Sequence, residues 1–222
     1  MKIFELIKDI LFPRRAECLG CGSRIGIDRD DMCEACRERL SKSWVGVKMP
    51  DSELKISNAA YAYRYASPAG GMVRKLKYSG VALISDEMAK DVARAAEMLH
   101  LRDALVTFVP MHPGRERKRG FNHSELLARG AAERLGFECA RLLVRTRNDP
   151  QQARLSREER INNLKGAFAV PDTEIDKVKG RNILLIDDVF TTGATAKNCA
   201  EALMNAGAAK VYFAAYAYGE RS

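Results

Sequence analysis

The sequence predicts an α/β protein in which a mostly parallel sheet is flanked by helices, with a small metal-binding segment before it. Aliphatic runs of strand length alternate with amphipathic segments, one run ends in two aspartates and a Thr/Gly turn, and four cysteines form two pairs near the N-terminus. An unbroken aliphatic run between turn signals is typical of a strand covered on both faces, as parallel strands are. The sheet is therefore expected to carry a ligand crevice at the carboxyl ends of its strands.

The elements of this sheet and its helices follow from periodicity and turn residues. Strands are expected at 59–65, 105–110, 137–144, 167–170, 183–186 and 210–218, and helices at 70–80, 82–99, 124–135 and 195–206. We divide the chain into an N-terminal helix with the four-cysteine segment (1–43), a connector (44–57) and the α/β domain (58–222).

Composition and charge are consistent with a globular protein that binds an anion. The 222 residues are 46% hydrophobic, which is enough for a sizeable core. The formal net charge is +8, which suits an anionic ligand or partner, although a solvated basic surface is the alternative.

The opening run, MKIFELIKDILFP, predicts a short amphipathic helix that caps the segment after it. It is too short and too charged to span a bilayer, and no small-residue cleavage site follows it. A helix lying on a membrane surface is the alternative, but its polar face carries acids as well as lysines. We expect a cytoplasmic protein without a transmembrane segment.

The cysteines at 18–36 have the spacing of a structural metal site. Cys18 and Cys21 form one C-x2-C pair, Cys33 and Cys36 form another, and eleven residues separate the pairs. Thiolates so arranged favour zinc in a closed tetrahedral site of the zinc-ribbon kind. Disulfides are disfavoured without a secretion signal, a redox-active site needs one pair only, and iron in the same geometry stays open. Zinc binding would supply most of the folding free energy of so small a segment.

The run ILLIDDVFTTGAT, residues 183–195, carries the chemistry of the predicted crevice. Asp187 and Asp188 follow a buried strand, where two adjacent carboxylates imply a diol, a cation such as Mg2+, or both. The turn after them is small or hydroxylated and suits a phosphate, with the N-terminus of the next helix aimed at it. Its residues are Thr191, Thr192, Gly193, Ala194 and Thr195. A carboxylate pair beside a phosphate cradle is what a ribose 5-phosphate requires.

Residues 183–195 resemble the signature of the type I phosphoribosyltransferase family at every position of its pattern. The pattern is four hydrophobic residues, two acids, a hydrophobic residue, any residue, two Ser/Thr, Gly, any residue and Ser/Thr. The resemblance implies the type I phosphoribosyltransferase fold and phosphoribosyl pyrophosphate as the ligand, with Mg2+. A P-loop ATPase fits less well because the chain contains no G-x-x-x-x-G-K-[ST], and a receiver-type acid pocket would need a further domain downstream.

A charge-dense loop is expected after the strand at 105–110. In a doubly wound sheet this turn opens onto the same crevice as the aspartates, so it suits the pyrophosphate group. Its candidate residues are Met111, His112, Arg115 and Arg119. Arg117 and Lys118 add charge, an ordinary solvated basic loop is the alternative, and His112 and His123 are weak candidates for chemistry.

The polar, basic segment 145–166 is too long for a casual connection, and long irregular segments in enzymes are often lids. Gln151, Arg160 and Asn163 are spaced so that a short helix could carry them over the site.

Several runs together resemble the ComF family of competence-associated proteins over essentially the whole chain. They are the four-cysteine segment, KLKYSG at 75–80, VPMHPGRERKRGFNHS at 109–124, the Gln151 to GAF segment and the phosphate loop. The family pattern more often has Gln where His123 stands. The resemblance implies a phosphoribosyltransferase-fold protein linked to uptake of single-stranded DNA during natural transformation, with single-stranded DNA and a DNA-uptake helicase as partners.

Two classes of function follow from these observations. One is a nucleic-acid-handling module with a nucleotide-sugar pocket, and the other is a phosphoribosyltransferase enzyme, for example in nucleotide salvage, without a DNA role. The basic surface suits sequence-independent binding of phosphates. Aromatic residues are only 7% of the chain, so extensive base stacking is not expected. No residue of the sequence stands out as selecting a nucleobase.

Overall fold

A computed structural model describes residues 17–25, 32–78, 81–146 and 166–219 of the chain. Its main sheet has the strand order β1-β2-β7-β6-β3. The strands are β1 (Trp44–Lys48), β2 (Asn58–Arg64), β7 (Lys210–Tyr218), β6 (Asn182–Phe190) and β3 (Leu105–Phe108). The pairs β2–β7, β7–β6 and β6–β3 are parallel and β1 runs antiparallel at the edge, as the predicted mostly parallel sheet requires.

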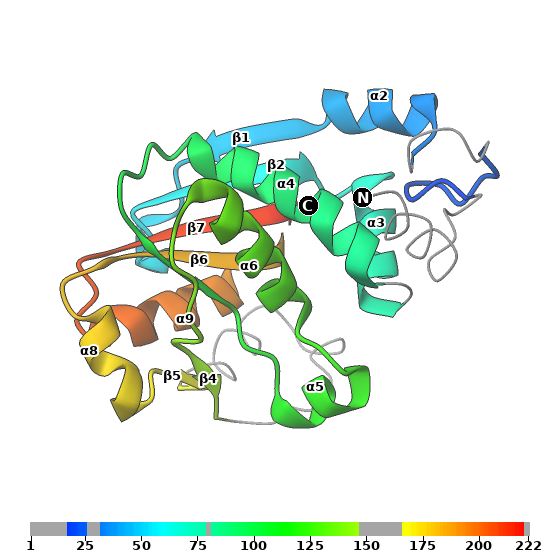
Figure 1. Ribbon diagram of the computed structural model, residues 1–222. Helices are drawn as coiled ribbons and strands as arrows, with labels where there is room; N and C mark the ends of the chain where they lie inside the picture. The colour runs from blue at the N-terminus through cyan, green and yellow to red at the C-terminus, as the bar shows by residue number, and fades with distance from the viewer. Residues whose placement is uncertain (1–16, 26–31, 79–80, 147–165, 220–222) are drawn as a thin grey trace, which may run out of the picture.

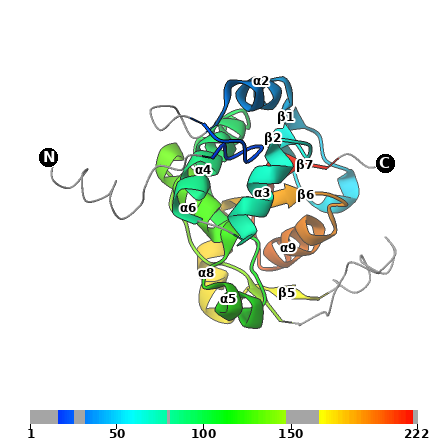
Figure 2. The same ribbon diagram turned by 90° about the vertical axis from the view of Figure 1, so that its right-hand side faces the viewer.

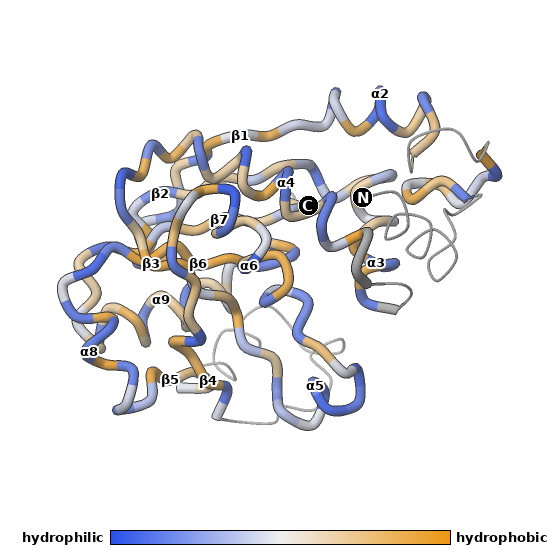
Figure 3. Tube along the Cα trace, viewed as in Figure 1, coloured by the Kyte–Doolittle hydropathy of each residue, from blue (hydrophilic) through white to orange (hydrophobic). Residues whose placement is uncertain are grey.

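Helices cover both faces of this sheet (Figure 1). The helices α3 (Ala69–Tyr78), α4 (Val81–Glu97) and α6 (His123–Leu135) pack on one face, and α9 (Ala194–Asn205) packs on the other. Two buried clusters result, one on each side, and the side chains of β6 alternate between them. Figure 3 shows the hydrophobic run of β6 between these layers and the hydrophilic surface of α5 (Pro113–Arg119).

Strand β6 is longer than expected, and this difference creates the crevice. The expected strand 183–186 continues to Phe190 because β7 pairs with it as far as Tyr218. On its other side β3 ends at Phe108, which is opposite Ile186. Asp187 and Asp188 therefore lie beyond the end of β3, where one edge of β6 is left without a paired strand among the described residues.

Three further elements differ from the expectations. The connector 44–57 contains β1, which forms because residues 44–48 pair with β2, and a 3-10 helix (Ser52–Leu54), whose first turn is capped by the side chain of Asp51. The loop after β3 contains α5, whose first turn is capped by His112. In place of the strand expected at 137–144, the structure has only the short strand β4 (Val144–Arg145), which pairs with β5 (Phe168–Ala169).

Residues 138–142 follow the edge of β3 without forming a regular strand. A bridge joins Val106 and Cys139, but the N–H group of Leu142 donates to the side-chain Oγ1 of Thr107 at 3.3 Å. A side-chain hydroxyl takes the place of a backbone carbonyl, so the ladder stops there.

The remaining described helices are short. They are α2 (Glu34–Lys42), α8 (Ile175–Val178) and the 3-10 helix Asp172–Glu174. Among the residues that the structure describes, no helix combines the length and the apolar character needed to cross a bilayer. The expected opening helix lies outside the described residues.

Candidate functional site

The four cysteines of the N-terminal segment converge on one point. The Sγ atoms of Cys18, Cys21, Cys33 and Cys36 all lie within 4.8 Å of one another. Cys21 Sγ and Cys33 Sγ are 3.8 Å apart, which matches the edge of about 3.8 Å in a tetrahedron of Zn–S bonds about 2.3 Å long. The cluster can therefore hold a metal such as zinc.

Hydrogen bonds to the sulfur atoms support their role as thiolate ligands. The Cys33 N–H donates to Cys18 Sγ at 3.3 Å, and Arg39 Nη2 lies 3.7 Å from Cys36 Sγ. Hydrogen bonds with Ser23 lower the pKa of Cys21 to about 6, whereas burial raises the pKa of the Cys36 thiol to about 12. Deprotonated sulfur is the form that binds metal ions.

The second candidate site, which contains the aspartates and the expected phosphate loop, lies in the turn between β6 and α9. Gly193 ends the turn with φ of 78° and serves as the N-cap of α9. A Cβ at this position would lie 2.9 Å from Phe190 Cζ, so both the backbone conformation and the available space require glycine. Glycine has no side chain with which to cap α9, so an anion can take the place of a cap at the first turn of this helix.

The expected phosphate loop lines a single pocket together with Asp187. Its members in this pocket are Thr191, Thr192, Gly193, Ala194 and Thr195. The Ala194 N–H donates to Thr192 Oγ1 at 3.4 Å, which closes the turn. Backbone N–H groups, hydroxyls and a helix N-terminus therefore meet beside a carboxylate, which is an arrangement suited to a phosphate next to a diol.

Asp187 is buried and held by hydrogen bonds. Its Oδ1 accepts from Ser124 Oγ at 2.8 Å and from the Asp188 N–H at 2.8 Å. Burial, followed by the charge of Asp188, raises the pKa of Asp187 to about 8. Without a ligand, this carboxyl is therefore largely protonated at neutral pH.

Asp188 has the opposite behaviour because it faces a lysine. Lys77 Nζ from α3 lies 2.6 Å from Asp188 Oδ2. Burial opposes ionisation of Asp188, but the charge of Lys77 outweighs it and holds the pKa of this carboxyl below its ordinary value. Burial opposes the charge on Lys77 as well, and the carboxylate keeps the lysine pKa above its usual range. The two aspartates are adjacent in sequence but differ in protonation.

His123 lies beside this ion pair as a neutral ring. Its Nε2 is 3.6 Å from Asp188 Oδ2, and burial lowers the pKa of His123 to about 4. Arg119 Nη1 is 3.3 Å from His123 Nδ1. A guanidinium group only donates, so Nδ1 accepts and the ring proton lies on Nε2. A chain of contacts therefore connects the basic helix α5 to the aspartates.

The residues that were expected to bind pyrophosphate have different roles in the structure. His112 Nδ1 accepts from the Gly114 N–H at 3.1 Å and so caps α5. Met111 lines a cavity beside α5, and Arg115 lies in the first turns of this helix. Of these candidates, Arg119 is the residue whose described contacts lead to the carboxylates.

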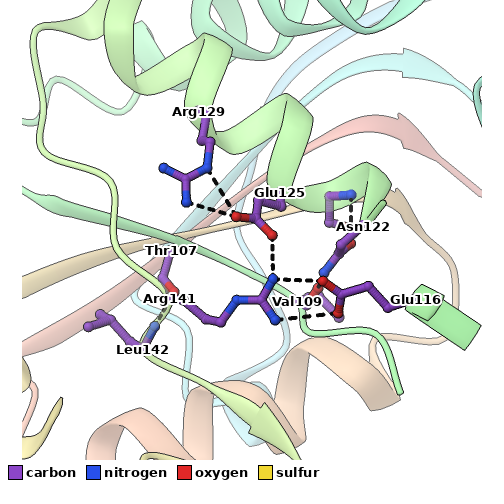
Figure 4. Close-up of polar contacts among 9 residues, drawn as sticks. Thr107, Val109, Glu116, Asn122, Glu125, Arg129, Arg141 and Leu142 are labelled. Carbon is purple, nitrogen blue, oxygen red and sulfur yellow. Dashed lines mark hydrogen bonds and ion pairs between the residues drawn. The ribbon is translucent and has the colours of Figure 1, made fainter. Parts of the chain in front are cut away.

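Ion pairs fix α5 in place (Figure 4). Arg141 Nη2 donates to Glu116 Oε1 of α5 at 2.8 Å and also pairs with Glu125 of α6, which in turn pairs with Arg129. The basic residues of α5 are therefore carried by an anchored helix rather than by a free loop.

Three polar residues of the site were not predicted from the sequence. Lys77 and Ser124 contact the aspartates directly, whereas Asn122 supports them. Asn122 Nδ2 donates to the carbonyl of Val109 at 3.1 Å, and its Oδ1 accepts from the Ser124 N–H at 3.0 Å, so it joins the end of β3 to the start of α6. All three lie in runs that carried the family resemblance, but spacing alone gave them no role. The expected lid residues Gln151, Arg160 and Asn163 lie outside the described residues.

Comparisons with known proteins identify relatives of this chain. The phosphoribosyl transferase domain family matches residues 122–222. The DNA utilization protein YhgH of Escherichia coli is 34% identical over 154 residues, and the match covers 66% of each chain. The competence protein ComFC of Bacillus subtilis is 27% identical, covering 90% of this chain and 82% of that protein. Competence protein F of Haemophilus influenzae is 23% identical, covering 87% of this chain and 93% of that protein.

Proposed function

We propose that this chain, which belongs to the ComF family of competence-associated proteins, binds phosphoribosyl pyrophosphate with Mg2+ at the carboxyl end of β6 and acts in handling single-stranded DNA. The fold is that of the phosphoribosyltransferases, and relatives carry names that refer to competence and DNA utilization. The match to the Escherichia coli relative spans 66% of that protein, so its DNA role is carried over as part of the proposal.

One observation carries the ligand assignment. Two buried aspartates lie where β3 has ended, and the same stretch of chain turns through Gly193 into the N-terminus of α9. A ribose 5-phosphate offers hydroxyls at one end and a phosphate at the other. The carboxylates bind the hydroxyls, directly or through a cation, and the backbone N–H groups of the turn bind the phosphate.

The donor set fits Mg2+, which prefers carboxylate oxygens and phosphate ligands. Asp187 and Asp188 would hold it together with the ligand, and it would supply positive charge for the hydroxyls and the pyrophosphate oxygens. Asp187 loses its proton when the ligand binds, while Lys77 and Arg119 provide further positive charge for the pyrophosphate group. The cluster at 18–36 holds zinc in a structural role.

The assignment is tested by removing the carboxylate charges. The double variant Asp187→Asn with Asp188→Asn should lose at least about 100-fold in affinity for phosphoribosyl pyrophosphate in calorimetry with Mg2+, because both ribose and cation lose their partners. Asp176→Asn, on the short helix α8, is the matched control. Equal affinities for the double variant and the control would overturn the assignment.

A transferase activity is the alternative for the same site. The C–O bond between the anomeric carbon and pyrophosphate would break, an acceptor would bond to that carbon, and the acceptor proton would leave with solvent. The chain would position the ribose, neutralise the leaving phosphates and exclude water. Release of pyrophosphate in the presence of mixed nucleobases, dependent on Asp187 and Asp188, is the result that favours this alternative.

A cavity beside α5 favours the nucleic-acid role. Its volume is about 420 Å3, and apolar side chains combine with arginines in its lining. The residues are Pro110, Met111, Pro113, Glu116, Arg117, Gly120, Arg141, Leu143, Val144 and Arg145. Apolar side chains next to arginines suit a base and its phosphate.

Salt dependence tests the DNA role. Single-stranded DNA should bind with little sequence preference, and a plot of log affinity against log salt should have a slope of about −0.7 per phosphate contact. Arg117→Glu, in the lining of the cavity, should flatten that slope, whereas Lys177→Glu on α8 should change it less because Lys177 is not among the lining residues. Binding that is absent at low salt, or insensitive to salt, would remove the DNA role and leave the transferase alternative.

A further inference from the structure

Helix α3 contacts both the four-cysteine cluster and the site of Asp187 and Asp188. At its N-terminal end, a Cβ placed on Gly71 would lie 2.5 Å from the carbonyl oxygen of Gly20, within the first cysteine pair. Farther along, Lys75 Nζ donates to the carbonyl of Cys18 at 2.7 Å. At its C-terminal end, Lys77 reaches Asp188 at 2.6 Å. Figure 2 shows α3 next to the dark-blue turn of residues 17–25, which carries the first cysteine pair.

The contact between α3 and the cysteine segment is tightly packed. A Cβ on Gly20 would lie 2.7 Å from Pro68 Cβ and 2.9 Å from Cys36 Sγ, so the turn is confined between the cluster and the chain that leads into α3. Leu19 is buried in the same core as Met72 of α3. The cysteine segment is therefore part of the wall against which α3 packs.

Helix α3 depends on such packing for its position. It has 10 residues, and helices of this length are only marginally stable by themselves in water. Its polar connection to the cysteine segment is the Lys75 bond to Cys18, and on the sheet side Tyr216 Oη donates to Met72 Sδ at 3.0 Å. A displacement of the cysteine turn would therefore reach Lys77 through one short helix.

We propose that the four-cysteine segment positions Lys77 at the carboxylate pair through α3, so that zinc occupancy and binding of the anionic ligand are linked. The inference rests on the proposed function of the Asp187–Asp188 site. Lys77 is a positioning residue for these carboxylates before the ligand arrives and a cation for its phosphates afterwards. Loss of the metal releases the cysteine turn, shifts α3 and removes this charge.

Linkage makes the proposal testable from either site. If zinc tightens the binding of phosphoribosyl pyrophosphate by some factor, the ligand must tighten zinc binding by the same factor. Zinc affinity is measured by equilibrium competition with a chromogenic chelator, using the full-length protein with and without saturating phosphoribosyl pyrophosphate and Mg2+. The ligand should raise the zinc affinity about 5-fold or more.

Two lysine variants separate positioning from simple stability. Lys75→Met breaks the link to Cys18 but leaves all four cysteines and both aspartates intact, and it should weaken ligand binding while zinc stays bound. Lys77→Met should retain zinc and lose the effect of the ligand on zinc affinity, and Lys77→Arg should restore part of it. Lys42→Met, an exposed lysine of α2 that pairs with Glu38, is the control for lost charge near the cluster.

The outcomes distinguish this inference from the proposed function. A protein that binds phosphoribosyl pyrophosphate with an unchanged zinc affinity contradicts the linkage and leaves the function standing. Equal ligand affinity in Lys75→Met and Lys42→Met also contradicts it. A protein that shows no binding of phosphoribosyl pyrophosphate overturns the proposed function itself.

Discussion

The cysteine cluster and the aspartate site differ in how the chain assembles them. Cys33 bonds to Cys18 from 15 residues away, and both come from one short segment. Ser124 bonds to Asp187 across 63 residues of sequence, and Lys77 comes from a third element. A metal site made by a short segment depends on its own turns, whereas a site at the end of a sheet depends on every element that the fold brings there.

The two regions also differ in what compensates their charge. The sulfur atoms form a closed set that a metal ion can satisfy with four ligands. Lys77 pairs with Asp188, and the aspartates remain asymmetric, with one carboxyl protonated and the other ionised at neutral pH. The closed cluster suits a structural role, and the asymmetric pair suits a ligand that brings its own cation.

The largest effect is expected from breaking the cysteine cluster. Cys36→Ser removes a buried ligand and should release the metal, destabilising the protein by about 3 kcal/mol or more, which is roughly 6–12 °C in Tm. Metal analysis and thermal unfolding measure the two effects. Cys139→Ser, outside the cluster, is the control and should keep its metal. A Cys36→Ser protein with full metal content would show that the cluster is not the metal site.

A glycine comparison tests whether the turn at the aspartate site holds an anion. Gly193→Ala should cost about 1–3 kcal/mol of stability through strain and should also weaken ligand binding, because a Cβ would meet Phe190 and reshape the turn. Gly180→Ala is the matched control, since φ there is 73° but an added Cβ would have open space around it. The Gly180→Ala variant should lose stability through backbone strain but should keep its ligand affinity. Equal ligand affinity for the two variants, measured by calorimetry, would contradict a phosphate at this turn.

The raised pKa of Asp187 makes ligand binding depend on pH. A carboxyl whose folded pKa is about 8 binds a proton that the unfolded chain has already lost near pH 4, so its contribution to stability declines as pH rises from about 4 to 8. Binding of the cation and ligand has the opposite sign because it needs the ionised form. Affinity should rise by up to about tenfold per pH unit between pH 6 and 8 and then level off.

Calorimetry in two buffers of different ionisation enthalpy measures the proton released on binding. The zinc content over the same pH range serves as the control, because the cysteine cluster should stay loaded. Affinity that is flat from pH 6 to 8, with no proton released, would show that Asp187 is already ionised in the free protein.

The smallest effect is expected at Ser124. Ser124→Ala removes the hydroxyl that donates to Asp187 and should weaken ligand binding by about 1 kcal/mol, or roughly 5-fold. That hydrogen bond lowers the pKa of Asp187, so its loss should also move the pH midpoint of binding upward. Ser41→Ala on the exposed face of α2 is the matched control. A midpoint that stays in place, or moves downward, would mean that Ser124 does not act through this carboxyl.

Features that are local along the chain could be predicted from its residues alone. The aliphatic run before Asp187, the glycine at 193 and the spacing of the cysteines each describe one turn or one strand, and the fold class follows from their order. Residue chemistry and spacing are enough there because strand pleat, turn conformation and chelate geometry act over a few residues. The predicted parallel sheet and the convergence of the cysteines were confirmed for this reason.

The distant side chains that complete the site follow from the packing of the elements in three dimensions. Ser124 reaches Asp187 because α6 begins beside the place where β3 ends at Phe108 while β6 continues, and Lys77 reaches Asp188 from α3, which packs over the neighbouring strand β7. The position of Leu19 in the main core likewise joins the cysteine segment to α3. These contacts cannot be predicted from the spacing of residues in the sequence. They depend on the register of strands of different length and on which helix packs over the strand ends.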